Sequence, residues 1–585
     1  MSSQAASAAR FGTAARRWEA RHADAPAGEA AALHTALHLD LPICQLLCTR
    51  GLSTPAAAAA FLRPSLEHLH DPYALAGMDA AVARVARAVQ DGETIFVHGD
   101  YDVDGICSVA LLTRVLRALG GTVHPFVPHR LHDGYDLSEA GVHAAAAAGA
   151  GLIITADCGI VAGEAVHAAA AAGMDVVITD HHAPGAELPA AAAVLNPNRG
   201  DCSYPFKGLA GAGVAYKLCQ ALVAVLGGHE DALRWNLDLV ALATIADLAP
   251  LTGENRVLAY FGLRVLRESR NTGLGALLDS AGMDRSVPLS AGSVSHGLGP
   301  RLNAAGRMGA AERGVRLLLT EDAVEAGALA SEIEEENRAR QRVDRDTLTE
   351  ALEGLERTFD PARDYGVVLA AEGWHPGVIG IVASRVVERI HRPTVLLSID
   401  RESGQARGSG RSIPAFDLLA GIRACAPLLT RFGGHHQAAG LEVPAERIGQ
   451  LRAAFNDAAR AALMPEDLVA RVPVDGELPL SQASAAFLAV LQHLGPFGLG
   501  NPTPVFVARA VRVEGYPKVV GDGHVRLRLE QDGNRLEAIG FRMAARLEEV
   551  DVSRGPIDVA YQLQENHWRG TVRLQAKLVD FRAAR

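Results

Sequence analysis

The sequence predicts an α/β protein: a doubly wound parallel sheet, a long connecting helix, a second and smaller α/β domain, and a C-terminal β-barrel. Between residues 94 and 250, short β-branched strands alternate with helical segments, a pattern typical of a parallel sheet covered by helices. A charged, helix-favouring stretch follows as far as Asp360, and a second strand–helix pattern occupies residues 365–463. Beyond residue 500, short alternating strands recur at regular spacing, which predicts a small barrel.

Each part of this architecture has its own sequence pattern. The strands of the first sheet are "TIFV", "TVHPFV", "GLIIT" and "DVVIT". The barrel strands are "HVRLRLE", "RLEAIGF", "IDVAYQL" and "TVRLQAKL". The predicted regions are an N-terminal extension (1–70), the first α/β domain (71–290), a helical region with the long helix (291–362), the second α/β domain (363–465) and the barrel (466–585).

Composition indicates a protein of several globular domains. The chain has 585 residues, of which 49% are hydrophobic and 21% charged. A membrane span needs about 18 consecutive apolar residues, and we find no such run, so no span is expected. Seven cysteines without metal-like clustering favour a reducing cytoplasm. We interpret the Arg- and Ala-rich first 18 residues as a disordered or loosely helical tail.

The net charge of −11 at first argues against a nucleic-acid substrate. Its distribution weakens that argument. The stretch Glu321–Asp360 alone has 13 acids and 5 arginines, as expected for one solvated helix joining two lobes. From Asn501 to the end, 14 basic residues outnumber 11 acidic ones. Net charge therefore does not decide the partner.

The stretch "HGDYDVDG", His98–Gly105, places three aspartates at alternate positions after a strand. Two carboxylates about 4 Å apart repel each other by roughly 4 kcal/mol at an effective dielectric near 20, which calls for a cation. An EF-hand is excluded because the twelfth loop position is Leu111 and a strand precedes the loop. In an extended segment Asp100, Asp102 and Asp104 would share one face. The alternative is that they are only turn formers.

Further ligand-type residues follow other elements of the same domain. They are Asp157 in "ADCG", Asp180, His181 and His182 in "TDHH", and Asp247 after "NLDLVALATIA". A single aspartate in such a place is more often a helix cap. Three acid-bearing segment ends with a histidine pair are not explained by caps. Because ligands bind beyond the carboxyl ends of parallel strands, the set predicts a metal centre there.

The motifs "HGDYDVDG", "ADCG" and "TDHH" resemble those of the DHH phosphoesterase superfamily. Six more stretches are similar to the RecJ family of bacterial exonucleases, which degrade single-stranded DNA from 5′ to 3′. These are "VPHRLHDGYDLS", "GLGPRLNAAGRM", "WHPGVIGIVASR", "GSGRS", "GGHHQAAG" and "LGPFGLGNPTPVF". The resemblance runs from about residue 60 to the end, and it implies a DHH domain, a DHHA1 domain and an OB-fold. One departure is Asp136, where glycine is expected.

The resemblance also implies two metal ions and their ligands. One ion would be held by His98, Asp102 and Asp157, and the other by Asp104, Asp157, His181 and Asp247. Asp100, Asp180 and His182 would orient these ligands or a bridging water. Mixed carboxylate and imidazole ligands favour Mn²⁺, with Mg²⁺ as second choice. Two ions about 3.5–4 Å apart would activate a shared water for attack on phosphorus.

The same resemblance implies substrate contacts. His435 would contact the scissile phosphate and, with Asp157, Asp100 and His182, complete the catalytic set. The terminal 5′-phosphate would be held by Arg130, Arg301, Ser409 and Arg411. Tyr135 would either stack on a base or pack internally. The barrel's candidate contacts are Tyr516, Lys518, Arg526, Arg528, Trp568 and Arg573, some of which alternation would turn into the core.

The expected function is a manganese-dependent, single-strand-specific 5′→3′ exodeoxyribonuclease that releases 5′-mononucleotides processively, in DNA repair and recombination. The expected partners are single-stranded DNA, a single-strand-binding protein and a helicase, with the chain acting as a cytoplasmic monomer. One alternative is a DHH phosphodiesterase for short oligoribonucleotides or cyclic dinucleotides, which would not need the barrel. The other is a scaffold with a dead site, which would lack ligands that this chain has.

Overall fold

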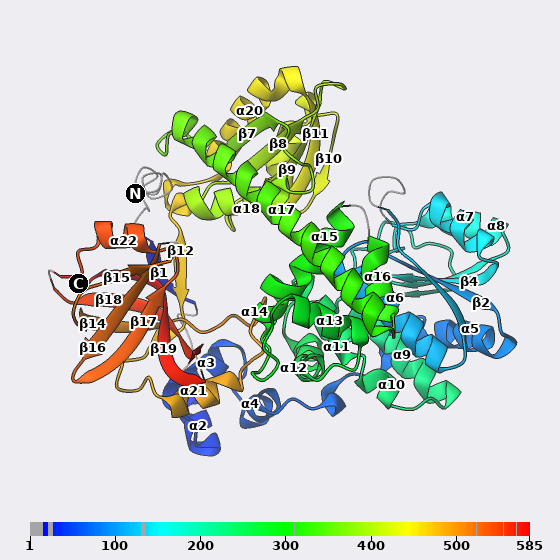
Figure 1. The fold of residues 1–585 in the computed structure, drawn as a ribbon, viewed down its shortest axis with the longest axis horizontal. Coiled ribbons are helices and arrows are strands. Elements are labelled where there is room, and N and C mark those ends of the chain that lie inside the picture. The colour runs from blue at the N-terminus through cyan, green and yellow to red at the C-terminus, as the bar shows by residue number, and fades with distance from the viewer. Residues whose placement is uncertain are drawn as a thin grey trace. The chain divides into compact units, whose positions relative to one another are not determined.

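The structure is a computed structural model that describes residues 16–21, 27–129, 136–308, 311–521, 523–553, 555–568 and 570–584 (Figure 1). It divides into two compact units. The first unit contains residues 60–339 and 492–503. The second contains the described residues up to 59, together with 340–491 and 504–584. None of the described helices combines the length and apolar character needed to cross a bilayer.

The first unit is built on a sheet of five parallel strands, as predicted. Their order is β3 (Thr122–Phe126), β2 (Thr94–Gly99), β4 (Ala150–Ala156), β5 (Asp175–Thr179) and β6 (Ala193–Leu195). The chain moves from β2 to β3 in one direction and from β4 to β6 in the other. The strand order therefore reverses between β2 and β4. Ligands of open α/β sheets bind at such a switch point.

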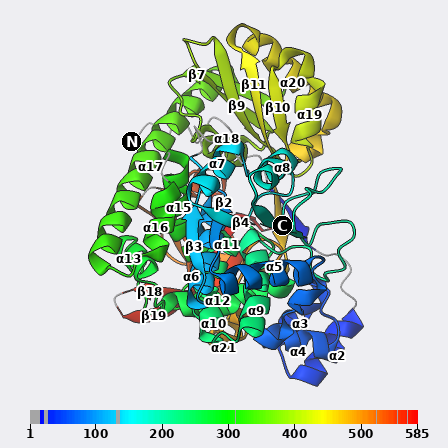
Figure 2. The ribbon, with the colours of Figure 1, turned by 90° about the vertical axis from the view of Figure 1, so that its right-hand side faces the viewer.

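Helices cover both faces of this sheet (Figure 2). One face packs against α5 (Met78–Asp91), α6 (Val103–Ala118) and α9 (Gly211–Leu226). The other packs against α7 (Glu139–Ala147) and α8 (Gly163–Ala171). Along β2, Ile95 and Val97 enter the first core and Phe96 the second, which is the period of two expected for a strand. The strand is buried on both faces, which explains its continuous apolar run.

A layer of helices completes the first unit. It contains α11 (Leu237–Ala246), α12 (Gly253–Arg267), α13 (Thr272–Ser280), α15 (Gly299–Met308) and α16 (Ala311–Leu319). The predicted long helix is α17 (Ala323–Thr358), which has 36 residues. Its first half belongs to the first unit and its second half, from Arg340, to the second. The connecting helix predicted from the charged stretch is confirmed.

The second unit contains the smaller α/β domain and the barrel. Its mixed five-stranded sheet has the order β10 (Arg431–Gly434), β11 (Ala438–Pro444), β9 (Gln405–Arg411), β8 (Thr394–Ile399) and β7 (Val367–Glu372). The helices of this domain are α18 (Ile379–Ile390), α19 (Leu418–Ala424) and α20 (Ile448–Ala462). This arrangement confirms the second α/β pattern.

The barrel is a seven-stranded sheet closed by an additional pairing of β14 with β16. Its strands are β13 (Gly476–Glu477), β14 (Phe506–Val513), β15 (Lys518–Val520), β16 (His524–Gln531), β17 (Asn534–Gly540), β18 (Ile557–Trp568) and β19 (Thr571–Ala583). Helices α21 (Ala485–Gln492) and α22 (Ala544–Glu549) accompany it. The predicted OB-type barrel is thus confirmed.

The N-terminal region is more ordered than the sequence suggested. Arg17–Ala20 forms strand β1, paired in parallel with β12 (Arg471–Val474). The expectation of a loose tail is therefore wrong for these residues, whereas residues 1–15 lie outside the described part. Helices α2 (Ala27–Leu37), α3 (Leu41–Thr49) and α4 (Pro55–Leu62) follow. All seven cysteines are buried free thiols.

A buried ion pair joins α9 to α12 in the first unit. Lys217 Nζ lies 2.6 Å from Glu254 Oε1, and the two side chains are 0% and 1% exposed. Tyr204 Oη donates to Glu254 Oε2 at 2.5 Å, and Lys217 also donates to the His70 carbonyl at 2.8 Å. This network ties α12 to α9, the helix whose N-terminal N–H groups donate to Asp104.

We predict that Glu254→Ala lowers the free energy of unfolding of the first unit by about 3–5 kcal/mol, because it leaves the Lys217 ammonium buried without its counter-ion. Urea unfolding measures this loss. The double variant Lys217→Met, Glu254→Leu should recover most of it, since a buried pair contributes little over apolar packing. The exposed pair Arg285–Asp279 is the control, and Asp279→Ala should cost less than about 1 kcal/mol. A loss from Glu254→Ala no larger than the control's would contradict the prediction.

Candidate metal centre

The acidic motif "HGDYDVDG" lies where β2 ends and α6 begins. Asp100 follows β2 directly, Asp102 is the N-cap of α6, and Asp104 lies in its first turn. Asp102 Oδ1 accepts hydrogen bonds from the backbone N–H groups of Asp104 and Gly105 at 2.9 and 3.1 Å. The prediction of one extended segment is thus wrong beyond Asp102. The three carboxylates converge because the chain turns into a helix, and not because alternate strand residues share a face.

The N-terminus of α9 holds the Asp104 carboxylate in place. Gly211 N donates to Asp104 Oδ2 and Ala212 N to Oδ1, both at 2.7 Å. Two backbone donors at a helix N-terminus stabilise an anion there. Sequence reasoning missed this cradle, although the glycine-rich run "GLAGAG" before a helix was available as its signal.

Asp157 lies at the end of β4 in a conformation unusual for a residue with a side chain. Its φ is 64°, in the left-handed region, and its side chain is buried. A Cβ atom at Gly211 would lie only 2.5 Å from Asp157 Oδ1, so glycine is required for this approach. Such strained backbone positions are typical of functional sites.

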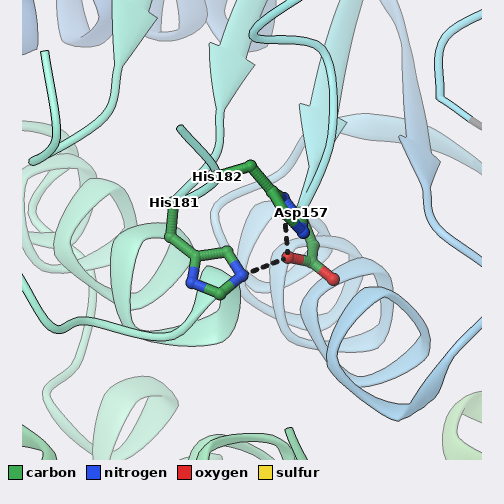
Figure 3. A group of neighbouring side chains, drawn as sticks. All are labelled: Asp157, His181 and His182. Carbon is green, nitrogen blue, oxygen red and sulfur yellow. Dashed lines mark ion pairs between the residues drawn. The ribbon is translucent and has the colours of Figure 1, made fainter. Parts of the chain in front are cut away.

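The histidine pair follows β5 and turns toward Asp157 (Figure 3). His181 Nε2 lies 3.1 Å from Asp157 Oδ1, and His182 Nδ1 lies 3.9 Å from the same oxygen. His182 Nδ1 is also 2.8 Å from Asp180 Oδ1, which in addition accepts hydrogen bonds from both histidine backbone N–H groups. These contacts of Asp180 fix the position of the histidine pair.

The electrostatics of the site favour the binding of a cation. Burial, and then repulsion by Asp104, raise the pKa of Asp247 to about 8. Burial and Asp102 raise the pKa of Asp100 to about 7. The pKa of Asp157 is raised well above its usual value by burial and by Asp104. The hydrogen bond with Asp180 raises the pKa of His182 to about 9. Acids this close stay ionised only beside a cation.

The side chains form three overlapping groups that could hold metal ions. Within each group the ligand atoms lie within 4.8 Å of one another: Asp157, His181 and His182; Asp104, His181 and Asp247; and Asp100, Asp102 and Asp157. The second group agrees with one predicted ion site. Asp100 Oδ1 is buried and accepts no hydrogen bond from the described residues, so it too has room for a ligand role. Carboxylate oxygens with imidazole nitrogens fit Mn²⁺.

Not every predicted ligand joins these groups. His98 is fully buried at the end of β2. Its Nδ1 lies 3.7 Å from Cys158 Sγ, its ring packs on Phe126, and a Cβ at Gly141 would lie 2.7 Å from its Nε2. Among the described residues, the three metal-capable groups do not include His98. Arg130 and Tyr135 lie outside the described residues.

Asp136 contacts the loop that follows Asp157. Its φ is 71°, which explains why glycine is expected at this position. Its Oδ1 accepts hydrogen bonds from the backbone N–H groups of Gly159 at 2.6 Å and Leu137 at 2.8 Å. The aspartate thereby fixes the loop that follows Asp157, a role that the sequence did not reveal.

The remaining predicted substrate residues lie on several elements. Arg301, on α15, is already engaged: its Nε donates to Glu334 Oε2 at 2.7 Å and its Nη1 to the Gly297 carbonyl at 2.8 Å. In the second unit, Ser409 and Arg411 lie on β9, and His435 is exposed between β10 and β11. Arg411 Nη1 donates to Ser409 Oγ at 3.1 Å and to the Gly410 carbonyl at 2.7 Å.

Comparison with known proteins identifies the domains. Residues 94–244 match the model of the DHH family, N-terminal domain; residues 364–461 match the DHHA1 domain; and residues 474–580 match the RecJ OB domain. Among curated proteins, the chain is 37% identical over 570 residues to the single-stranded-DNA-specific exonuclease RecJ of Bacillus subtilis, covering 96% of this chain and 70% of that protein. It is 37% identical to the Escherichia coli RecJ, covering 86% of this chain and 89% of the other.

Solved structures agree with these matches. The crystal structure of RecJ from Thermus thermophilus in complex with Mn²⁺ superposes with a TM-score of 0.80 at 32% identity, covering 97% of this chain and 79% of that one. The same enzyme in complex with Mg²⁺ gives a TM-score of 0.75 at 31% identity. The resemblance deduced from the motifs is confirmed, and the chain belongs to the RecJ family.

Proposed function

We propose that this protein is a metal-dependent exonuclease that hydrolyses single-stranded DNA from its 5′ end and releases 5′-mononucleotides, in DNA repair and recombination. The observation that carries the proposal is the set of four aspartates and two histidines gathered around Asp157 at the switch point of the sheet. The barrel favours a polymer over short oligoribonucleotides or cyclic dinucleotides as substrate. The scaffold alternative is disfavoured because the acids of the site are all retained.

The residues of the centre have distinct parts in this chemistry. Bound Mn²⁺ or Mg²⁺ would supply Lewis acidity and lower the pKa of a coordinated water. Asp157 belongs to two of the three groups, so it would be the ligand shared between the ions. Asp104 is aimed by the α9 N-terminus, and His182 is oriented by Asp180. We further propose that His435 contacts the scissile phosphate and stabilises the charge that develops there.

Polarity would come from a site for the terminal 5′-phosphate on the second unit. Burial lowers the pKa of Arg411, and no carboxylate among the described residues forms an ion pair with it. Gly380 lies in the first turn of α18, and a Cβ there would meet Ser409 Oγ at 2.9 Å and Arg411 Nη2 at 3.0 Å. A desolvated guanidinium, a hydroxyl and a helix N-terminus together suit a phosphate. By the family resemblance, Arg301 on α15 would contact the same phosphate.

The barrel carries a basic row suited to a DNA strand. Lys518 pairs across the sheet with Arg526, which pairs with Ile539, which in turn pairs with Lys577. Directly opposed residues point to the same face, so the three cations form one line. Phe541 is exposed beside this row, with Lys577 Nζ 5.8 Å from its ring centre. Cations for phosphates and an aromatic ring for base stacking are the components of single-strand recognition.

The family resemblance also supports proposals about the oligomeric state, the location and the partners of the protein. The chain would act as a monomer in the cytoplasm, with a single-strand-binding protein and a helicase as partners.

The metal centre is tested by Asp157→Asn. Loss of residues behind metal ligands costs about 10- to 100-fold, so loss of the shared ligand should lower Mn²⁺-dependent hydrolysis by more than about 100-fold. Calorimetric titration should show fewer bound Mn²⁺ ions per chain. Gly211→Ala should act in the same direction, because its Cβ would collide with Asp157. The exposed Asp231→Asn is the control, and hydrolysis by Asp157→Asn within tenfold of the parent would contradict the assignment.

The 5′-phosphate site is tested by Arg411→Ala on 5′-phosphorylated and 5′-hydroxyl strands. A charge-assisted hydrogen bond contributes roughly 1.5–3 kcal/mol, so kcat/KM on the phosphorylated strand should fall about 10- to 150-fold. The 5′-hydroxyl strand lacks the partner group and should lose much less. Gly380→Ala should reproduce this selectivity, and Gly449→Ala, where a Cβ meets nothing within 4 Å, should not. Equal losses on both strands would reject the site.

The barrel row is tested by the triple variant Lys518→Ala, Arg526→Ala, Lys577→Ala. Each lost phosphate contact should reduce the salt dependence of single-strand binding by about 0.7 in log–log slope, or about 2 in all. Phe541→Ala should lose about 1–3 kcal/mol of binding to long strands. Fluorescence anisotropy over a salt series measures both. Arg535→Ala is the control, because its guanidinium group pairs with the Glu514 carboxylate. An unchanged slope in the triple variant would assign the barrel another task.

A further inference from the structure

A cavity of about 230 Å³ opens beside the acids of the metal centre in the first unit. Three elements form its wall: the Tyr101–Asp104 turn, the end of α11, and α15. Asp102, Asp104 and Asp247 contribute carboxylates, and α15 contributes Asn303 and Gly306. A water molecule occupies about 30 Å³ in the liquid, so the cavity has room for a phosphate group with some of its hydration.

Helix α15 is held tightly against the acidic turn. A Cβ atom at Gly306 would lie 2.2 Å from the Tyr101 carbonyl oxygen, so only glycine permits this approach. One turn earlier, Asn303 Oδ1 accepts a hydrogen bond from the backbone N–H of Val103 at 3.3 Å. Val103 lies between Asp102 and Asp104 in the chain. The hydrogen bond to Val103 and the close approach of Gly306 to Tyr101 therefore fix the position of Asn303 relative to these acids.

This hydrogen bond determines which way the Asn303 amide points. A backbone N–H can only donate, so the atom that faces Val103 must be the amide oxygen, and the Nδ2 group with its two protons lies on the other side. Among the described residues no acceptor takes these protons. Beside a bound cation the carboxylates of the cavity wall would be ionised, and they would then only accept hydrogen bonds. The Asn303 amide nitrogen is thus a hydrogen-bond donor in a cavity whose other polar side chains include three carboxylates.

We propose that Asn303 is a substrate-binding residue: its Nδ2 donates a hydrogen bond to a non-bridging oxygen of the phosphodiester that is hydrolysed. The inference rests on the proposed nuclease function and deepens it, since it adds a neutral donor to a site of acids. The same side chain has a second part, because its oxygen supports the turn that carries Asp102 and Asp104. The two parts use different atoms and can be separated.

The test compares Asn303→Asp with Asn303→Ala in the full chain, using a 5′-phosphorylated single strand and Mn²⁺. Aspartate keeps the acceptor for Val103 but removes the donor. Both variants should lower kcat/KM by about 10- to 150-fold, the range for a hydrogen bond to a charged group. The affinity of Asn303→Asp for Mn²⁺, measured by calorimetry without DNA, should not fall, because aspartate keeps the acceptor for Val103. Asn456→Asp is the matched control, since Asn456 likewise accepts from backbone N–H groups, of Tyr365 and Gly366, in the second unit.

Phosphorothioate strands separate hydrogen bonding from the charge that aspartate adds. Sulfur in place of the bonded oxygen should slow the parent more than Asn303→Ala for one diastereomer, while the other slows both equally. Parental turnover by Asn303→Asp, equal sulfur effects in the parent and Asn303→Ala for both diastereomers, or a loss of Mn²⁺ affinity in Asn303→Asp would each overturn the proposal. A parent chain that leaves single-stranded DNA intact would instead overturn the proposed function itself.

Discussion

Mutual repulsion of buried carboxylates is the constraint on which the first unit depends. Five aspartates meet where the strand order reverses, and the structure raises the pKa of several of them because burial and neighbouring charges disfavour ionisation. The fold offsets part of this cost with backbone dipoles. The α9 N-terminus faces Asp104, and the α6 N-terminus faces Asp102. The remainder requires a cation, so stability and chemistry are linked at one point.

Much of this arrangement could be predicted from sequence because strand ends and helix starts have local signals. Alternating strands and helices gave the parallel sheet, and parallel strands place their carboxyl ends at one edge. The positions of Asp157 and His181 at that edge followed directly, whereas Asp247 ends helix α11 and its part in the site came from the family resemblance. The geometry of Asp104 did not, because capping by Asp102 starts α6 at Val103, before the apolar helical pattern that begins at Cys107. Helix boundaries depend on side-chain hydrogen bonds that hydrophobic periodicity does not register.

Contacts between distant segments account for what sequence reasoning missed. The Gly211 cradle and the Asp136 hydrogen bond to Gly159 join loops that lie far apart in the chain, and neither residue type is distinctive alone. The same holds for Arg301, which pairs with a glutamate on a helix predicted only as a solvated connector. For the barrel, the sequence did not decide which candidate residues point outward; in the structure Lys518 and Arg526 are both exposed.

The placement of residues 492–503 in the first unit has a consequence for biosynthesis. Arg256 donates to the carbonyls of His493 and Gly495, and Leu251 N donates to the Leu499 carbonyl, close to the loop that bears Asp247. These contacts join a segment made late to helices made early. At about 5–20 residues per second, translation reaches this segment some 8–30 s after the end of the first unit's main stretch. During translation, the loop beside Asp247 therefore forms its contact with Leu499 only after the second α/β domain has been synthesised.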